Sequence, residues 1–179
     1  ALRFPAPLVG SLIHSQSNPG TAPGKGAGNM ELYHYCPVPL ENGSVITPGN
    51  WGRIIRQYPM PDNCNAIVVK ELLLENIRLR LYPSYPSRLD CAYVCIGEES
   101  AKEFKSRREL HFCYHVDLVS PSMPSFQGSW KHFEMPPRSL EDWHRAAEKY
   151  WSTNWVTESP NTLELLTMSP IRILGKVSL

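Results

Sequence analysis

The sequence lacks a strong excess of charge of either sign and lacks long apolar runs. Its 179 residues include 18 basic and 17 acidic ones, which gives a formal net charge of +1. Proteins that bind nucleic acid usually show a clear basic excess or stripe, so we expect no nucleic-acid partner. No apolar run approaches the roughly 18 residues of a membrane helix, so we expect no membrane partner. A Gly-x-Gly-x-x-Gly or P-loop motif is also lacking, so a glycine loop for nucleotide phosphates is not supported.

Glycine is scarce beside proline, with 11 glycines against 17 prolines. Proline breaks helices and is excluded from central strands, so helix bundles and long coiled coils are excluded. A hydrophobic share of 42% and a charged share of 20% exclude a disordered chain. The odd number of cysteines, five, does not suit a disulfide scaffold. We therefore expect free thiols in a reducing compartment.

The first 29 residues differ in composition from the rest of the chain. They hold four of the prolines and five of the glycines, and Arg3 and Lys25 are their only charged residues. Such a segment cannot offset its ordering entropy by burial, so we interpret residues 1–29 as a flexible Pro/Gly-rich leader. Residues 30–179 are expected to form one folded domain. Because the sequence starts at Ala1 without an initiator Met, we expect it to be a fragment.

Apolar periodicity predicts an α+β domain of short strands with a few helices. The expected strands are 31–36, 91–96 and 110–118, followed by a hairpin of 163–166 with 171–177. The expected helices are 66–81, 100–104 and a segment capped by Ser139 that runs to Trp151. The segments 48–52 and 121–137 are expected to be loops that carry Trp51 and Trp130.

Histidines and cysteines offer two chemistries, neither of which we favour. His111, Cys113 and His115 alternate along one expected strand and share a face, with Cys91 or Cys95 as a fourth zinc ligand. Their spacing matches no closed zinc pattern, so we expect no metal. A cysteine–histidine nucleophile is also conceivable, but no cysteine lies in the turn sequence of a known thiol enzyme. We interpret most of the thiols as small buried hydrophobes.

Two glutamates, Glu71 and Glu75, lie one helical turn apart and could share a proton. Lys70, Arg78 and Arg80 lie close to them in the sequence. Charges of both signs at helical spacing are typical of a solvated face with weak ion pairs. We therefore expect this pair to lie at the surface of the 66–81 helix.

Four sites are harder to explain by packing alone. His34 lies in a strand between two tyrosines, and Tyr93 lies in the middle of another strand. The pair Ser87–Arg88 directly precedes that second strand, and an arginine there could bind a phosphate with two hydrogen bonds. Glu164 lies in an apolar strand, where a carboxylate is costly unless it is paired or used.

The segments around these residues resemble a known bacterial family. They are Leu32–His34, Glu71–Arg78 with Tyr85–Cys95, Tyr150–Trp151 and Leu163–Leu166. The family is catalogued as a domain of unknown function and is related to the ADP-ribosyltransferases. Within that family the chain resembles the CteC-type secreted effectors, which are similar to mono-ADP-ribosyltransferases that modify a threonine of host ubiquitin. The resemblance covers residues 30–177.

The resemblance implies an ADP-ribosyltransferase-like split β-sandwich with flanking helices around an NAD cleft. In that fold His34 would hold a ribose of NAD, and Ser87 and Arg88 would bind ribose or pyrophosphate. Residues 30–179 would then be the catalytic domain.

The resemblance also assigns the residues next to the reacting bond. Tyr93, or the nearby Tyr82 or Tyr85, would stack on the nicotinamide. Glu164 would be the catalytic glutamate, with His34 and Tyr93 completing the catalytic set. Glu158, six residues upstream, is the alternative acid.

The expected function is transfer of ADP-ribose from NAD to a threonine hydroxyl of a host protein, with ubiquitin as the expected acceptor, which would block ubiquitination. We expect a monomer that acts as a bacterial effector secreted into the host cell cytoplasm. Trp51 and Trp130 are expected to line the cleft or touch the acceptor. The alternatives are an NAD glycohydrolase on the same fold, a non-catalytic module that binds a protein through the Trp51 and Trp130 loops, and, more distantly, a zinc hydrolase.

Overall fold

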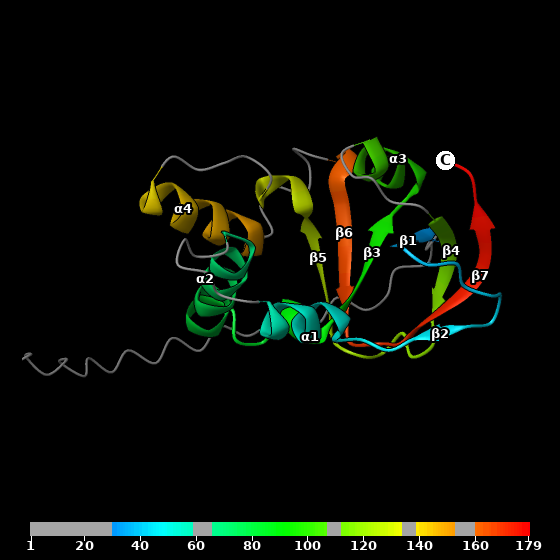
Figure 1. The fold of residues 1–179 in the computed structure, drawn as a ribbon. Coiled ribbons are helices and arrows are strands. Elements are labelled where there is room, and N and C mark those ends of the chain that lie inside the picture. The colour runs from blue at the N-terminus through cyan, green and yellow to red at the C-terminus, as the bar shows by residue number, and fades with distance from the viewer. Residues whose placement is uncertain (1–29, 59–65, 107–111, 134–138, 153–159) are drawn as a thin grey trace, which may run out of the picture.

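A computed structural model describes residues 30–58, 66–106, 112–133, 139–152 and 160–179. Helices and strands alternate along these residues, and the strands form a seven-stranded antiparallel sheet, so the predicted α+β class is confirmed (Figure 1). The predicted leader, residues 1–29, lies outside the described residues. No helix in the described ranges is long and apolar enough to cross a membrane.

The strands of the sheet follow one another in the order β2-β7-β4-β1-β3-β6-β5. Their bounds are β1 Leu32–Cys36, β2 Val45–Ile46, β3 Ala92–Ile96, β4 Phe112–Leu118, β5 Ser125–Ser129, β6 Leu163–Thr167 and β7 Ile171–Val177. The α-helices are α1 Asn50–Gln57, α2 Ala66–Leu81, α3 Glu98–Ser106 and α4 Leu140–Trp151. Short 3₁₀ turns are η1 Arg88–Asp90, η2 Trp130–Phe133 and η3 Pro160–Thr162.

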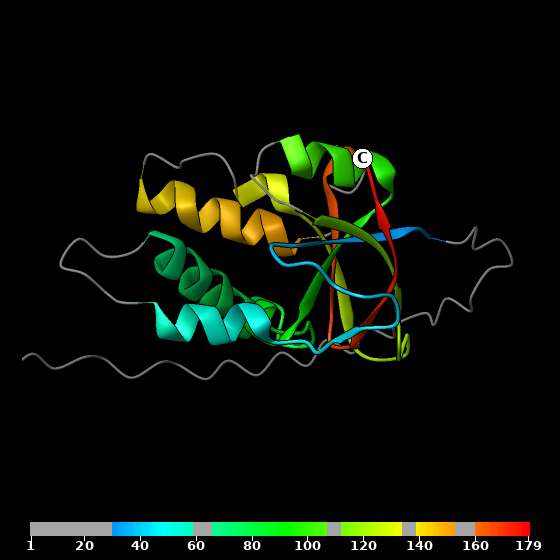
Figure 2. The same ribbon diagram turned by 45° about the vertical axis from the view of Figure 1, so that its right-hand side comes forward.

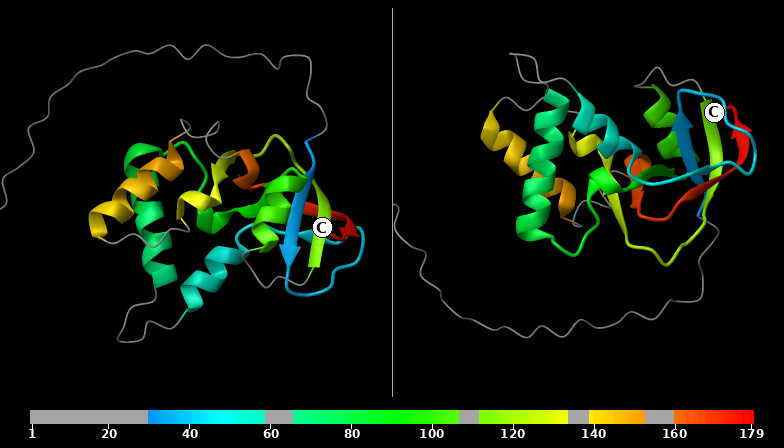
Figure 3. Two further views of the ribbon diagram at one scale, coloured as in Figure 1. Left: turned by 90° about the horizontal axis from the view of Figure 1, so that it is seen from above. Right: turned by 60° about the horizontal axis from the view of Figure 1, so that its bottom comes forward.

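The junction between β1 and β3 is the least regular part of the sheet. Every residue of β1 pairs with β4, whereas β1 pairs with β3 only through Leu32 with Ile96 and Tyr33 with Cys95. Beyond these two pairs the strands diverge, and β3 crosses the direction of β1 and β4 (Figures 2 and 3). The divergence leaves the second half of β1 with one free edge, toward β3.

Two helices and the β5–β6 side of the sheet enclose the largest apolar cluster. Figure 1 shows α2 and α4 gathered beside β5. Trp151 of α4 is fully buried there and donates its indole N–H to the carbonyl oxygen of Leu74 in α2, at 2.9 Å. A buried indole needs such a partner, so this bond fixes how the two helices meet. The cluster is formed by Leu74, Ile77, Cys91, Phe126, Ala147, Tyr150, Trp151 and Leu166.

The two long helices begin and end where local signals predict. Helix α2 spans the predicted residues and ends before Pro83. Helix α4 begins after Ser139, whose side chain accepts a hydrogen bond from the backbone N–H of Asp142 at 3.1 Å. Along α2, Leu74 and Ile77 are buried, whereas Ile67 is 42% exposed and Leu81 is 51% exposed.

The predicted loops are wrong in part. The segment predicted as a loop around Trp51 starts α1, after a turn at Gly49 with a φ of 85°. Residues 50–57 pack so closely on η1 that a Cβ at Gly52 would lie 2.1 Å from the carbonyl oxygen of Leu89. The other predicted loop contains β5 and η2, which includes Trp130. A proline-rich sequence thus still contributes an edge strand, because its prolines lie outside Ser125–Ser129.

The predicted hairpin of 163–166 with 171–177 is also wrong. Strand β6 pairs with β3 and β5, and β7 pairs with β4 and β2. The residues between them bond to another segment, since Val119 donates to the carbonyl oxygen of Pro170 at 2.9 Å and Met168 donates to that of Pro124 at 3.0 Å. Through these bonds the connection crosses from one half of the sheet to the other, so β6 and β7 do not pair as a hairpin.

Cys36, Cys91, Cys95 and Cys113 are free thiols, as predicted, and the last three are buried. Cys64 lies outside the described residues.

Candidate functional site

A cavity of about 320 Å³ opens where β1 and β3 diverge. Its lining combines aromatic side chains with charged ones, and four of the predicted site residues belong to it: His34, Arg88, Tyr93 and Glu164. They come from β1, from η1 and from the adjacent strands β3 and β6. The fold therefore brings together residues that are far apart in the sequence. The volume lies in the range of about 300–1,000 Å³ that is typical of ligand pockets.

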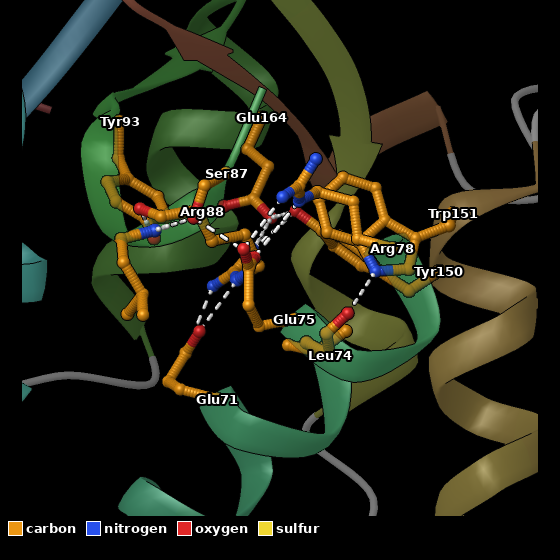
Figure 4. A network of polar contacts seen from close by, with 11 residues as sticks. Glu71, Leu74, Glu75, Arg78, Ser87, Arg88, Tyr93, Tyr150, Trp151 and Glu164 are labelled. Atoms are coloured by element: carbon orange, nitrogen blue, oxygen red, sulfur yellow. Dashed lines mark hydrogen bonds and ion pairs between the residues drawn. The ribbon is translucent and has the colours of Figure 1, made fainter. Parts of the chain in front are cut away.

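Arg88 is the centre of the polar network beside this cavity (Figure 4). Its Nε donates to Glu71 Oε2 at 3.0 Å and its Nη2 to Glu71 Oε1 at 3.4 Å. Its Nη1 donates to Glu164 Oε1 at 3.0 Å and also to the hydroxyl of Tyr150. All three nitrogens of the guanidinium are thus engaged by protein groups. The sequence predicted that Arg88 binds a phosphate, but in the structure its side chain already binds two carboxylates.

The Glu164 carboxylate is held by one of its two oxygens. Oε1 accepts from Arg88 Nη1 and from the Tyr150 hydroxyl, which lies 2.8 Å away. Within the described ranges, no group donates a hydrogen bond to Oε2. The residue is 6% exposed, in the second position of β6. The side chain is therefore fixed in direction while one oxygen is left for a ligand in the cavity.

Glu71 is buried, which corrects the expectation of a solvated Glu71–Glu75 pair. Its side chain is 1% exposed, because its position on α2 faces η1. Burial by itself raises the pKa of Glu71, but the Arg88 guanidinium outweighs burial and leaves that pKa below its ordinary value. The indole N–H of Trp51 also lies near Glu71 and lowers its pKa further, although it makes no hydrogen bond of ordinary geometry. Glu71 is therefore an ionised carboxylate in the wall of the cavity.

His34 has a defined tautomer. Its Nδ1 lies 2.8 Å from the carbonyl oxygen of Tyr93, and because a carbonyl only accepts, Nδ1 must carry the proton. Burial lowers the pKa of His34, and the bond to Tyr93 offsets this only in part. The ring is therefore neutral at pH 7, and its Nε2 is a hydrogen-bond acceptor.

Two tyrosines enclose the Arg88 side chain. The guanidinium carbon lies 5.0 Å from the ring centroid of Tyr93 and 4.8 Å from that of Tyr150. The Tyr93 hydroxyl donates to the backbone carbonyl oxygen of Arg88 at 2.6 Å. Burial raises the pKa of both tyrosines well above the ordinary value, so both phenols stay neutral. Both rings stabilise the cation through their faces and keep it in place.

Ser87 and Tyr85 do not reach the cavity. Ser87 accepts a hydrogen bond from the backbone N–H of Leu89, which caps η1, and donates to Glu75 Oε2 at 3.0 Å. Tyr85 stacks on Tyr82 with ring centroids 5.7 Å apart and packs in the apolar cluster of α2 and α4. These residues position η1 rather than bind a ligand in this cavity.

The remaining predicted groups have mixed outcomes. Trp51 and Trp130 both line the cavity, as one of the two interpretations expected. Cys113 is buried, and among the described residues no group of three or more His, Cys, Asp or Glu is arranged to hold a metal. His111 and Glu158 lie outside the described residues.

Several residues of the cavity lining were absent from the predicted set, and Lys70, Glu71 and Tyr150 are the ones with polar groups that bear most on the site. Helical spacing does carry a signal for one of them, because Val68, Glu71 and Leu74 fall on one stripe of α2 and all three are buried. The lining contains two basic side chains and two acidic ones, so its formal charges cancel; they are Lys70, Arg88, Glu71 and Glu164. Such a cavity, walled by aromatic rings, suits a planar ring that is neutral or cationic, joined to hydroxyl groups that Glu164 and His34 could bind.

Comparison with known proteins leaves the function open. No curated protein matches the chain. A family model described as "Protein of unknown function (DUF2441)" matches residues 50–178, which include α1 to β7 but not β1 with His34. Because this match covers most of the chain, the protein belongs to the DUF2441 family.

Proposed function

We propose that the protein is an NAD-dependent mono-ADP-ribosyltransferase that modifies a hydroxyl side chain of another protein. One observation carries the proposal: the Glu164 carboxylate is anchored through Oε1 and leaves Oε2 for a ligand, in a cavity that it shares with His34 and Tyr93. His34, Tyr93 and Glu164, the three residues that the resemblance assigns to catalysis, lie on the neighbouring strands β1, β3 and β6. The divergence of β1 from β3 supports the split β-sandwich that the resemblance implies.

The cavity has suitable partners for the nicotinamide riboside part of NAD. The nicotinamide ring of NAD is cationic, and aromatic side chains such as Tyr93, Trp51 and Trp130 attract cations through their faces. The Nε2 atom of His34 accepts a hydrogen bond from a ribose hydroxyl, because its tautomer is fixed by Tyr93. In this proposal the ribose lies between His34 of β1 and Glu164 of β6.

Arg88 takes a different role from the phosphate contact expected from the sequence. Its guanidinium is already shared by Glu71, Glu164 and Tyr150, so it holds the carboxylate instead of a pyrophosphate. Lys70 is the other basic residue in the cavity lining. We assign the pyrophosphate contact to Lys70, since a lysine binds phosphate well as a point charge.

The reaction breaks the bond between the nicotinamide nitrogen and C1′ of the ribose, and the electron pair leaves with nicotinamide. The ribose then carries positive charge, as in a glycosidic transition state. Glu164 Oε2 accepts a hydrogen bond from the 2′-hydroxyl and stabilises this charge by about 3 kcal/mol in a site that excludes water. The acceptor hydroxyl oxygen bonds to C1′, and its proton passes to Glu164.

The acceptor and the setting rest on the resemblance. We propose a threonine hydroxyl of ubiquitin as the acceptor, a monomeric enzyme and secretion into a host cell. Neutral aromatic walls around the ribose favour transfer over hydrolysis, because they exclude water from C1′.

The decisive experiment compares wild type with Glu164→Gln, which keeps the shape of the side chain and removes its charge. Each protein is incubated with NAD and ubiquitin, and the added ADP-ribose is measured by mass spectrometry. We expect Glu164→Gln to lose at least about 100-fold in rate, as for a lost electrostatic group in a preorganised site. Glu158→Gln and the exposed Glu148→Gln are the charge-matched controls and are expected to keep the wild-type rate.

Four outcomes would change the proposal. A Glu164→Gln variant with wild-type activity would overturn the role of Glu164, and a loss confined to Glu158→Gln would move the role to Glu158. Nicotinamide release that is as fast without an acceptor as with one would identify an NAD glycohydrolase. No NAD binding by calorimetry, with partner binding retained, would favour the non-catalytic module.

A further inference from the structure

Glu71 contacts the same guanidinium as Glu164, from the opposite side of the network. It lies on α2, 17 residues before Arg88 in the sequence, and its side chain is nearly fully buried. We infer that Glu71 is a positioning residue, which acts through Arg88 to keep the Glu164 carboxylate turned toward the cavity. This inference rests on the proposed function, because it assigns Glu71 to the same reaction.

The hydrogen bonds divide the guanidinium between the two glutamates. Glu71 occupies the edge formed by Nε and Nη2, with distances of 3.0 and 3.4 Å. Glu164 receives only Nη1, at 3.0 Å, and shares it with Tyr150. The two-point contact with Glu71 therefore sets the plane of the guanidinium, and the one-point contact leaves Glu164 with a free oxygen.

Without Glu71, Arg88 and Glu164 would favour a two-point contact with each other. An arginine and a carboxylate bind most strongly through two parallel hydrogen bonds. If the Nε and Nη2 edge lost its partner, the guanidinium would be free to turn and bind both oxygens of Glu164. Oε2 would then be taken by Arg88 and lost to a ribose hydroxyl. Glu71 thus prevents Arg88 from neutralising the carboxylate that it holds.

The charges lead to the same conclusion. Arg88 carries one positive charge and faces two buried carboxylates, Glu71 and Glu164. A lone Arg88–Glu164 pair would have no net charge, whereas the cluster of three has one negative charge; Lys70, which we assign to the pyrophosphate, supplies the positive charge that balances the lining as a whole. Excess negative charge beside the ribose stabilises the positive charge that develops in the transition state more than it stabilises bound NAD. Loss of Glu71 should therefore reduce kcat more than it weakens NAD binding.

The same helix provides a matched control. Glu75, one turn after Glu71, makes a two-point ion pair with Arg78, at 3.0 and 2.7 Å, and accepts from Ser87. Neither Glu75 nor Arg78 lines the cavity. Glu75→Gln removes the same charge from the same helix and weakens a similar ion pair, but it leaves the contacts of Arg88 in place.

The test measures kcat and KM for NAD in the transfer reaction for wild type, Glu71→Gln, Glu71→Asp and Glu75→Gln. We expect Glu71→Gln to lower kcat roughly 10- to 100-fold, the effect of a small misplacement of a reacting group, with KM changed less than about threefold. Glu71→Asp keeps the charge but is too short for the two-point contact, so its kcat should also fall at least about tenfold. Glu75→Gln should keep the wild-type kcat. Thermal melting shows which variants are folded.

The outcomes separate this inference from the proposed function. Wild type that neither binds NAD nor transfers ADP-ribose overturns both. Active wild type with a folded Glu71→Gln or Glu71→Asp that keeps the wild-type kcat overturns the role of Glu71 alone. The same holds if Glu75→Gln lowers kcat as much as Glu71→Gln, or if the loss appears only in KM. If Glu71→Gln does not fold, Glu71→Asp decides, since it keeps two buried carboxylates beside Arg88.

Discussion

Replacing Arg88 by methionine tests the buried charge network directly. The residue is 9% exposed, and its side chain joins η1 to α2, to α4 and to β6 through Glu71, Tyr150 and Glu164. Methionine matches the aliphatic stem of arginine but lacks the guanidinium, so the change keeps the packing of the stem. It leaves two buried carboxylates without their cation, which is the costly way to break a buried ion pair.

The expected loss is large relative to the stability of a domain. Removing one partner of a buried pair costs about 3–5 kcal/mol, out of a total of about 5–15 kcal/mol. With a urea dependence of about 2 kcal/mol per molar, the unfolding midpoint should fall by roughly 1.5–2.5 M. Arg145→Met is the control, because Arg145 pairs with Asp142 at the surface, with its side chain 68% exposed. In Arg145→Met the free energy of unfolding should fall by less than about 0.5 kcal/mol.

The pH dependence of stability should also change. In wild type the folded-state pKa of Glu71 is lowered. Glu71 therefore contributes to the stability of the fold above its unfolded pKa of about 4.3, and this stabilisation is lost as pH falls further. In Arg88→Met, burial acts without Arg88 and raises that pKa. The carboxyl group then favours folding below pH 4.3, and this contribution is lost as pH rises through the folded pKa. The variant should therefore be closest to wild type in acid.

The assay is urea unfolding followed by tryptophan fluorescence at pH 7 and pH 5. We expect the gap between Arg88→Met and wild type to be largest at pH 7 and smaller at pH 5. A loss below about 1 kcal/mol at pH 7, or a gap that does not change with pH, would refute the view of Arg88 as the cation that holds two ionised carboxylates.

Two further changes test the packing and the histidine. Gly52→Ala should lower the free energy of unfolding by about 1–3 kcal/mol, because its Cβ would lie 2.1 Å from the Leu89 carbonyl oxygen and α1 would have to shift. The control is Gly175→Ala, whose Cβ meets open space, so its Tm should fall less. Equal falls in Tm would contradict this account. The lowered pKa of His34 removes stability as pH falls below about 6.5, so His34→Gln should show a smaller drop in urea midpoint between pH 7 and pH 5 than wild type. An unchanged drop would argue against a buried neutral His34.

Local sequence signals predicted the two long helices, α2 and α4, well, although α1 was missed. The stop at Pro83 and the cap at Ser139 act within one helical turn, so the bounds of α2 and the start of α4 follow from neighbouring residues alone. Strand pairing depends on residues that are far apart in the sequence. The short separation of 163–166 from 171–177 favours a hairpin, but the bonds from this connection to Val119 and Pro124 send the two strands to different halves of the sheet.

The site was predictable where a residue was unusual in its own surroundings. Glu164 in an apolar strand and Arg88 before one both carry a cost of burial that calls for a partner, and both line the cavity. Glu71 was missed because Lys70 and Glu75 beside it give the pattern of a solvated helix face. Its partner comes from η1, outside the helix, and spacing within α2 cannot reveal a contact of that kind.

The place of β1 in the sheet bears on where this family's domain begins. The family match starts at residue 50, yet β1 lies between β4 and β3 and joins the strands β2, β7 and β4 to β3, β6 and β5. A protein cut at the edge of the match would lose the strand through which the two groups meet, together with His34. Alignments and expression boundaries for DUF2441 proteins should therefore extend upstream to include residues equivalent to 30–49. Among the described residues, the first strand along the chain is the middle strand of the sheet.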